Sequence, residues 1–159
     1  MRVLIISDTH RKNDNYFKLL EKIKDIDMVI HCGDTEGSEY AISEAAGCET
    51  HIVMGNNDFF SQLPKEIETQ IGGYRVWITH GHTYCVSIGS ERIKEEALLR
   101  GVDIVMFGHT HKPLLEIEDD VIAVNPGSLS YPRQDGRRPS YMIMEIDRNG
   151  EAHFTLNYL

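Results

Sequence analysis

The chain has 159 residues, of which 41% are hydrophobic and 26% are charged, as is typical of a globular domain. These values exclude a disordered, collagenous or membrane-spanning protein, so we expect one domain over residues 1–159 built around one core. The 16 Lys and Arg residues against 25 Asp and Glu residues give a formal charge of −9. Because such an acidic protein repels the phosphate backbone, we expect no long nucleic acid among its partners.

Three cysteines, Cys32, Cys48 and Cys85, form no CxxC motif, and their odd number cannot pair completely within one chain. This cysteine usage predicts a reducing compartment. The first apolar run, Val3 to Ile6, is too short for the core of a signal peptide and far short of the roughly 20 residues that span a membrane. We therefore expect a cytoplasmic protein without a membrane partner.

The first half of the chain alternates between strand and helix patterns. Residues 2–7 are apolar and β-branched without polar alternation, which predicts a strand buried on both faces. Apolar residues at helical spacing then predict a helix, and the same order of patterns repeats. The expected elements are strand 2–7, helix 14–24, strand 28–31, helix 38–46 and strand 51–54. This alternation is typical of a parallel sheet with right-handed crossovers.

The second half predicts antiparallel pairs. Gly72 and Gly73 separate two apolar runs, and a two-residue link of this kind favours a hairpin. The expected elements are strands 67–71 and 74–79, helix 88–100, strand 103–107, and two hairpins, 114–117 with 121–124 and 141–146 with 152–157. The β structure is therefore expected to be mixed. The longest stretches without a pattern, 55–65 and 125–140, are candidate functional loops.

Polar side chains directly follow several of the predicted strands. They are Asp8, His10, Asp34, Asn56, Asp58, His80, His82, His109 and His111. Ligands of open α/β sheets bind beyond the carboxyl ends of the strands, so we expect these side chains to converge on one site. Carboxylate, imidazole and amide donors without a thiolate suit Mn²⁺, Fe, Ni²⁺ or Zn²⁺. The alternative is a set of unrelated polar turns, which the ordered series of motifs disfavours.

Taken in order, the motifs SDTH, CGD, GNND, THGH and GHTH resemble those of the calcineurin-like metallophosphoesterase superfamily. The short chain and the NPGS sequence at 125–128 are similar to its small YfcE-type phosphodiesterase branch. The resemblance covers essentially the whole chain. It implies an α/β fold, a four-layer α/β/β/α sandwich with two mixed sheets, and two metal ions at the strand ends.

The resemblance also implies which residues hold each ion. Asp8, His10, Asp34 and His111 would hold the first, and Asp34, Asn56, His80 and His109 the second, with Asp34 bridging both. The implied activity is that of a phosphodiesterase or phosphatase that hydrolyses small organic phosphate esters by attack of a metal-bound hydroxide. Mn²⁺ is the expected cofactor, with Ni²⁺, Fe and Zn²⁺ as alternatives. Two divalent ions would make the pocket locally positive and attract a small phosphate ester to a negative protein.

Asn57 is a departure from the family pattern, because many relatives carry a histidine at this position. An amide can hydrogen-bond a phosphoryl oxygen but cannot protonate a leaving group, so weaker activity on esters with poor leaving groups is expected. The adjacent Asp58 is expected either to orient a metal ligand or to cap its loop. His82 is the nearest remaining acid or substrate contact, and a structural loop histidine is the alternative that we favour.

Three arginines, Arg133, Arg137 and Arg138, lie close together after the NPGS sequence. They could bind a second phosphate or a nucleotide, but such a charge pattern more often forms a solvated turn. His31 lies within a strand pattern and is interpreted as a structural residue.

An alternative function is a phosphoesterase-like scaffold that binds partner proteins, as the retromer's phosphoesterase-like subunit does. Scaffolds of this kind tend to lose metal ligands, whereas every ligand position in this chain carries a competent side chain. A scaffold is also expected to expose an apolar patch. The hairpins near the C-terminus offer a β edge that could support a homodimer.

Overall fold

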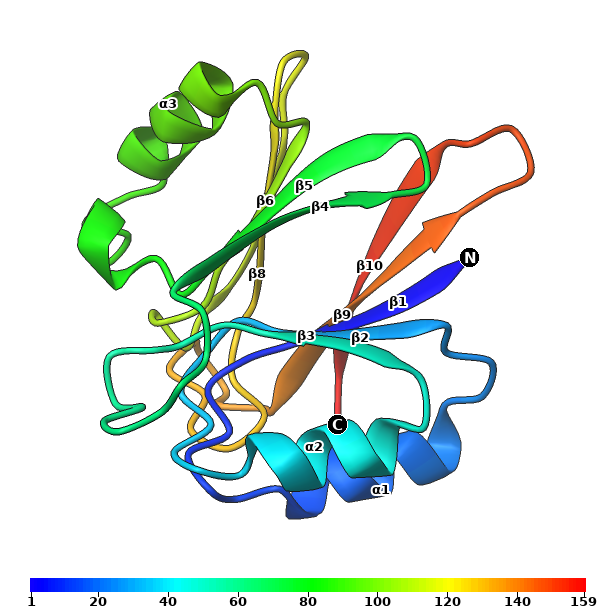
Figure 1. The fold of residues 1–159 in the computed structure, drawn as a ribbon, viewed down its shortest axis with the longest axis vertical. Helices are drawn as coiled ribbons and strands as arrows, with labels where there is room; N and C mark the ends of the chain where they lie inside the picture. Colours follow the sequence, from blue (N-terminus) through cyan, green and yellow to red (C-terminus); the bar gives the residue numbers. More distant parts are fainter.

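The computed structural model describes residues 1–159, which form two five-stranded sheets with helices on their outer faces (Figure 1). The first sheet has the order β10-β9-β1-β2-β3, from β1 (Arg2–Ile6), β2 (Met28–His31), β3 (Glu49–Ile52), β9 (Ser140–Ile146) and β10 (Ala152–Tyr158). The second has the order β4-β5-β6-β8-β7, from β4 (Glu66–Ile71), β5 (Tyr74–Thr79), β6 (Ile104–Met106), β7 (Pro113–Ile117) and β8 (Ile122–Pro126).

Both sheets are mixed, as the sequence predicts. The strands β1, β2 and β3 run parallel, and β9 and β10 add an antiparallel pair at one side. In the second sheet, β5, β6 and β8 run parallel, while β4 and β7 are antiparallel strands at the two edges. The carboxyl ends of five parallel strands, three from one sheet and two from the other, therefore supply the loops that carry the predicted site.

The helices cover the outer faces of the sheets. Helices α1 (Asp14–Lys22) and α2 (Glu39–Ala46) lie against the first sheet, and α3 (Glu91–Arg100) lies against the second (Figure 1). Each helix buries apolar side chains against its sheet, such as Tyr16 and Leu19 from α1 and Ile42 from α2. A short 3₁₀ helix, η1 (His82–Tyr84), follows β5. The order of layers is helix, sheet, sheet, helix, which confirms the expected four-layer sandwich.

The apolar interior is divided into three clusters rather than the one core expected from the chain length. The largest cluster lies between the sheets and contains side chains such as Ile5 and Ile30 from one sheet and Ile78 from the other. A second cluster joins the first sheet to α1 and α2, and a third joins the second sheet to α3 around Trp77. Four layers create three interfaces, and each interface excludes water separately.

Several element boundaries differ from the prediction. The third strand spans Glu49–Ile52 instead of 51–54, because the backbone of Met54 leaves the sheet to donate a hydrogen bond to the carbonyl of Pro64, at 2.8 Å. Helix α3 starts at Glu91 instead of residue 88. The strand expected at 121–124 extends to Pro126, so the candidate loop 125–140 starts at Gly127.

None of the helices combines the length and apolar character needed to cross a membrane. The three cysteines are free thiols, and Cys32 is buried among apolar side chains of the intersheet cluster. Strand β10 pairs only with β9 and therefore forms an open edge of the first sheet. A homodimer through this edge stays a prediction.

Candidate metal centre

The structure brings all of the predicted metal-binding residues to one end of the two sheets. Asp8 and His10 follow β1, Asp34 follows β2, Asn56 follows β3, His80 follows β5, and His109 and His111 follow β6. Their side chains form two groups that meet at the carboxylate of Asp34. The rule that sites form beyond the carboxyl ends of parallel strands therefore applies to both sheets at once.

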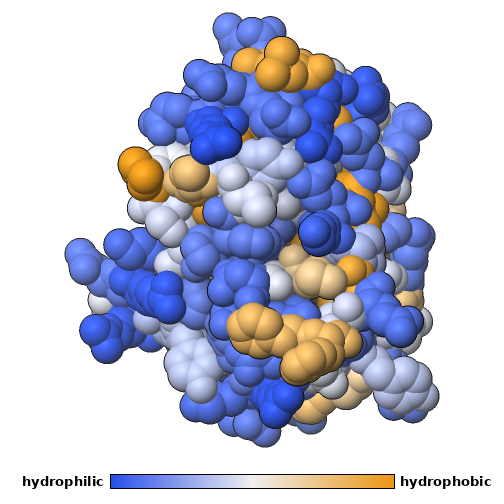
Figure 2. Space-filling view, turned by 60° about the vertical axis from the view of Figure 1, so that its left-hand side comes forward, coloured by the Kyte–Doolittle hydropathy of each residue, from blue (hydrophilic) through white to orange (hydrophobic).

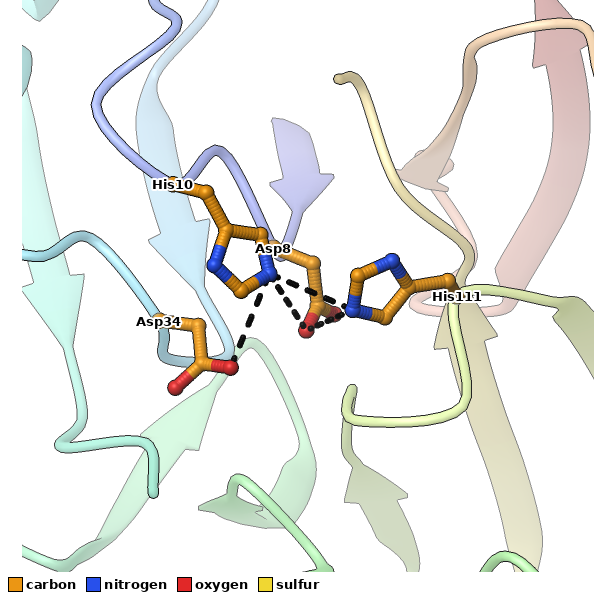
Figure 3. A group of neighbouring side chains, drawn as sticks. All are labelled: Asp8, His10, Asp34 and His111. Atoms are coloured by element: carbon orange, nitrogen blue, oxygen red, sulfur yellow. Dashed lines mark hydrogen bonds and ion pairs between the residues drawn. The ribbon is translucent and has the colours of Figure 1, made fainter. Parts of the chain in front are cut away.

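The first group contains Asp8, His10, Asp34 and His111 (Figure 3). One donor atom from each of the four lies within 4.8 Å of the others. The Nε2 atom of His111 is 3.1 Å from Oδ1 of Asp8 and 3.2 Å from Nε2 of His10. Nε2 of His10 is 3.7 Å from Oδ2 of Asp34. Four N and O donors thus surround one small volume.

The second group contains Asn56, His80 and His109, together with Asp34. The side-chain oxygen of Asn56 is 3.0 Å from Nε2 of His80 and 2.9 Å from Nδ1 of His109. Nε2 of His80 is 3.5 Å from Oδ2 of Asp34, the same oxygen that faces His10. Asp34 therefore lies between the two groups, in the position that a bridging carboxylate requires.

The loops that carry these donors have unusual backbone conformations. Five of the seven predicted metal ligands have a positive φ, which is uncommon for residues other than glycine. They are Asp8 at 55°, His10 at 46°, Asp34 at 62°, His109 at 68° and His111 at 57°. Such conformations cost free energy for L-residues and persist where the surroundings hold them in place, often at functional sites. The strain is concentrated at the strand ends where the donors converge.

Two glycines of the motifs allow the close approach of these loops. A Cβ atom on Gly55 would collide with the side chain and backbone of Asp34. A Cβ atom on Gly108 would collide with Oγ of Ser7 and would lie 2.8 Å from Oδ2 of Asp8. The glycines in the GNND and GHTH motifs thus leave room for the two carboxylates.

Three of the histidines are oriented by hydrogen bonds on the far side of the ring. Nδ1 of His10 is 2.6 Å from a carboxylate oxygen of Glu36. Nδ1 of His111 is 2.7 Å from the carbonyl oxygen of Tyr131, and Nδ1 of His80 is 2.7 Å from that of Cys32. Each of these oxygens accepts a hydrogen bond from Nδ1, so the Nε2 atom of each ring points to the centre, as in metal-ligating histidines.

Glu36 is a residue that the sequence interpretation missed. It lies in the loop after β2, and its carboxylate reaches across to His10 from a position 26 residues further along the chain. No signal in the sequence separates this glutamate from the many exposed acids of the chain. Only the fold shows that it fixes the ring of His10.

Asp58 ties two of the donor loops together. Its carboxylate is buried and accepts hydrogen bonds from the backbone N–H groups of Asp34 at 2.9 Å, Gly55 at 2.7 Å and Glu36 at 2.5 Å. It also accepts one from the hydroxyl of Thr35, at 3.1 Å. These contacts join the loop after β2 to the loop after β3, as a loop cap would, and the positioning of a metal ligand by Asp58 stays a prediction.

Asn57 and His82 lie at the edge of the centre. The side-chain amide of Asn57 donates a hydrogen bond to Oδ2 of Asp34 at 2.7 Å, and its backbone N–H donates to Oδ1 at 2.8 Å. His82 is exposed in η1, with its ring centroid 5.4 Å from that of His80 and 6.1 Å from that of His109. His82 makes no hydrogen bond to the donor groups.

The charge of Asp34 is favoured by its neighbours. Burial alone would raise the pKa of its carboxyl group, but the nearby imidazole of His80, 3.5 Å away, and the hydrogen bonds from both amides of Asn57 outweigh burial and hold the pKa well below its usual range. The carboxylate between the two groups is therefore ionised at neutral pH.

The arrangement fits divalent cations. Oδ1 of Asp8 belongs to a fully buried carboxylate and has no hydrogen-bond partner, although its neighbours are the Nε2 atoms of His111 and His10. Burying an anionic oxygen without a hydrogen-bond donor costs free energy, and a cation bound to this oxygen and to the two imidazoles would offset that cost. The mixture of carboxylate, imidazole and amide donors suits Mn²⁺, Fe, Ni²⁺ or Zn²⁺.

The sequence matches the calcineurin-like phosphoesterase superfamily domain over residues 1–149. The chain belongs to this superfamily. It is 31% identical over 150 residues to the probable metallophosphoesterase YsnB of Bacillus subtilis, an alignment that covers 94% of this chain and 86% of YsnB. It is 33% identical over 146 residues to the phosphodiesterase MJ0936 of Methanocaldococcus jannaschii, with 80% of this chain and 83% of MJ0936 covered.

The fold of this superfamily member is also shared with known structures. The crystal structure of wild-type Vps29 from Entamoeba histolytica complexed with Zn²⁺ superposes with a TM-score of 0.78 at 24% sequence identity. The alignment covers 99% of both chains. At this level of identity the likeness concerns the fold alone.

Proposed function

We propose that this chain is a phosphodiesterase or phosphatase that hydrolyses small organic phosphate esters with two divalent cations. The observation that carries the proposal is the position of Asp34, whose Oδ2 atom faces both donor groups, 3.7 Å from His10 and 3.5 Å from His80. Membership of the calcineurin-like superfamily and the phosphodiesterase name of MJ0936 support the same class of reaction. Mn²⁺ is the cation that we expect first.

The proposed ligands divide as the two groups do. Asp8, His10, Asp34 and His111 would hold one cation, and Asp34, Asn56, His80 and His109 would hold the other. Two divalent cations supply an activated water and stabilise the negative charge of an in-line displacement at phosphorus. Glu36 keeps Nε2 of His10 directed to the centre, and Asp58 keeps the backbone of Asp34 in place.

Beside the centre the protein offers a side chain that can donate a hydrogen bond to a phosphoryl oxygen, but that side chain is not a general acid that could protonate the leaving group. The amide of Asn57 is the donor nearest to Asp34, and an amide cannot act as a general acid at neutral pH. We therefore expect esters of acidic alcohols, such as nitrophenol, to be turned over faster than esters of aliphatic alcohols. His82 is the other candidate donor at the edge of the site.

The net charge limits the size of the substrate. Two divalent ions would add four positive charges to a chain of formal charge −9 and concentrate them in one pocket. A small phosphate ester is attracted to that pocket, whereas a long nucleic acid would meet an acidic surface. The free thiols fit the cytoplasmic location that we also propose.

The test uses metal-free protein and bis-p-nitrophenyl phosphate. We expect no release of nitrophenol without metal, release after addition of Mn²⁺ or Ni²⁺, and about two metal ions per chain by elemental analysis. Asp34→Asn is expected to reduce turnover by at least a hundredfold, because it weakens both metal positions, whereas the exposed Asp120→Asn is a matched control that keeps it. A wild-type protein that stays inactive with Mn²⁺, Ni²⁺, Fe²⁺ and Zn²⁺ would overturn the proposal.

A scaffold for partner proteins is the alternative. It draws on the likeness to Vps29, but that likeness concerns the fold alone. A scaffold has no need of a full donor set, which this chain keeps. On the face that Figure 2 shows, which is largely hydrophilic, the apolar side chains form small separate groups and not the one continuous patch expected of a docking surface; this holds for that face alone.

A further inference from the structure

A pocket of about 640 Å³ opens beside the first donor group. Its lining includes His10 and His111, which we propose as metal ligands, together with Tyr131, Arg133 and Arg137. Two of the proposed metal ligands and two arginines therefore line one pocket. The sequence alone favoured a solvated turn for these arginines, but their place in the fold indicates a second role.

The loop that carries Arg133 is fixed to a metal-binding residue at two points. The carbonyl of Tyr131 accepts a hydrogen bond from Nδ1 of His111 at 2.7 Å, and the backbone N–H of Arg133 donates to the carbonyl of His111 at 3.0 Å. The hydroxyl of the buried Ser128 accepts a further bond from the backbone N–H of Tyr131, at 2.8 Å. The backbone position of Arg133 is thus tied to that of His111.

Arg137 lies in a strained turn of the same loop. Its backbone N–H donates to the carbonyl of Gln134 at 3.0 Å and closes the turn. Gly136 has a φ of 77° and Arg137 one of 44°, a left-handed conformation that is unfavourable for a residue with a Cβ atom. Strain of this kind at the wall of a site is typical of residues placed for function.

The charges of the two arginines are not used inside the protein. Neither side chain forms an ion pair or a hydrogen bond, and the one acid that lines the pocket, Glu36, has its carboxylate 2.6 Å from Nδ1 of His10. Arg138 differs, because its guanidinium lies over the ring of Tyr158, 5.1 Å from the centroid, and donates to the carbonyl of Leu159. Only two of the three arginines therefore face the pocket.

We propose that Arg133 and Arg137 form an anion subsite that binds a second phosphate group of the substrate. A planar guanidinium pairs with two phosphate oxygens at once, and two of them beside the metal centre match a dianion. The substrate class is then a phosphate ester whose alcohol part carries another phosphate. This inference rests on the proposed function, which supplies the first phosphate position.

The test compares two nucleotides that differ only by one phosphate. Binding of thymidine 3′,5′-bisphosphate and of thymidine 5′-monophosphate to Mn²⁺-loaded protein is measured by titration calorimetry. We expect the wild type to bind the bisphosphate about tenfold more tightly, since a charge-assisted hydrogen bond contributes about this factor. In Arg133→Gln/Arg137→Gln the preference is expected to fall below about threefold. The matched control Arg138→Gln removes one charge from the same loop and keeps the preference.

Equal affinity of the wild type for the two nucleotides would overturn the subsite, as would an unchanged preference in the double variant. Turnover of the 5′-p-nitrophenyl esters of the same two nucleotides separates this result from the proposed function. If neither ester is hydrolysed but the variants change the binding preference as expected, the subsite stands and the hydrolase proposal fails. If both are hydrolysed and bind alike, the hydrolase proposal stands and the subsite fails.

Discussion

His31 is a buried imidazole that the fold holds in its neutral form. Its Nδ1 atom accepts a hydrogen bond from the backbone N–H of Gly33 at 3.2 Å, so Nε2 carries the proton and donates to the hydroxyl of Thr9 at 3.1 Å. Protonation of Nδ1 would direct its N–H at the backbone N–H of Gly33, and neither group could accept a hydrogen bond from the other. Burial, supported by the nearby charge of His80, lowers the pKa of His31 to about 4 against the opposing effect of the carboxylates of Asp8 and Asp58.

This neutral histidine makes the stability of the protein depend on pH. The pKa of His31 is 6.5 in the unfolded chain and about 4 in the folded one, so between these values the unfolded state binds more protons. The folded state therefore loses stability as the pH falls through this window. When the pH is lowered from 7.5 to 5, we expect the free energy of unfolding of the metal-free wild type to fall by about 2 kcal/mol more than that of His31→Gln. Urea unfolding in the presence of EDTA measures the difference.

Gln is the suitable replacement because its amide can both donate to Thr9 and accept from Gly33, yet it does not titrate. Every other acid and base of the chain is present in both proteins, so their contributions cancel in the comparison. Equal losses in the two proteins would show that His31 is protonated in the folded state at pH 5, against this prediction.

Asp58 acts at the scale of the loops, because one carboxylate joins the segment after β2 to the segment after β3. Replacement by Ala would leave the backbone N–H groups of Asp34 and Gly55, among others, buried without their acceptor. Each buried N–H left without an acceptor costs about 1–3 kcal/mol, so the two N–H groups of Asp34 and Gly55 alone predict that Asp58→Ala reduces the free energy of unfolding by about 3 kcal/mol or more. Urea unfolding of the metal-free protein is the measurement, with the exposed Asp120→Ala as the control.

A loss below about 1 kcal/mol in Asp58→Ala would contradict this assignment and would mean that water replaces the carboxylate. The affinity for metal gives a second measurement of the role of Asp58. Because Asp58 holds the backbone of Asp34, the variant is expected to bind Mn²⁺ more weakly than the control, even though its proposed ligands are intact.

The sequence predicted the identity and order of the main elements because buried parallel strands are plain apolar runs. The predicted boundaries are less accurate at the edge of the first sheet. Strand β3 is an edge strand that starts with Glu49 and Thr50, so its first half carries no apolar signal, and the apolar Val53 and Met54 lie beyond its end. The helix expected from residue 88 begins only at Glu91, because the backbone N–H of Ile88 bonds to the carbonyl of Cys85 in a separate turn.

The proposed metal ligands were predictable for a related reason. Each one follows an apolar run that the sequence displays, and the strand-end rule then places them together. Contacts between loops carry no such signal. The bond between Glu36 and His10, and the one between the carbonyl of Tyr131 and His111, depend on how distant segments close in space. The arginine pocket beside the centre is hidden from the sequence for the same reason.

At the scale of the whole molecule, the centre connects the two sheets. Asp8, Asp34 and Asn56 come from the first sheet, whereas His80, His109 and His111 come from the second. The acidic chain, with a formal charge of −9, repels itself when compact. Cations bound at this seam between the two sheets would neutralise negative charge and hold the two sheets together.

Cation binding at the seam is therefore expected to stabilise the fold. A ligand present at about 100 times its Kd stabilises the native state by about 2.7 kcal/mol, and for a chain of this size each kcal/mol raises Tm by about 2–4 °C. We expect Mn²⁺ to raise Tm by about 5–10 °C relative to protein in EDTA, as measured by calorimetry. Asp34→Asn should lose most of this shift. If it keeps the full shift, the ions bind elsewhere, and the exposed group of Asp147, Glu151 and His153 is the first place to test, with Asp147→Asn.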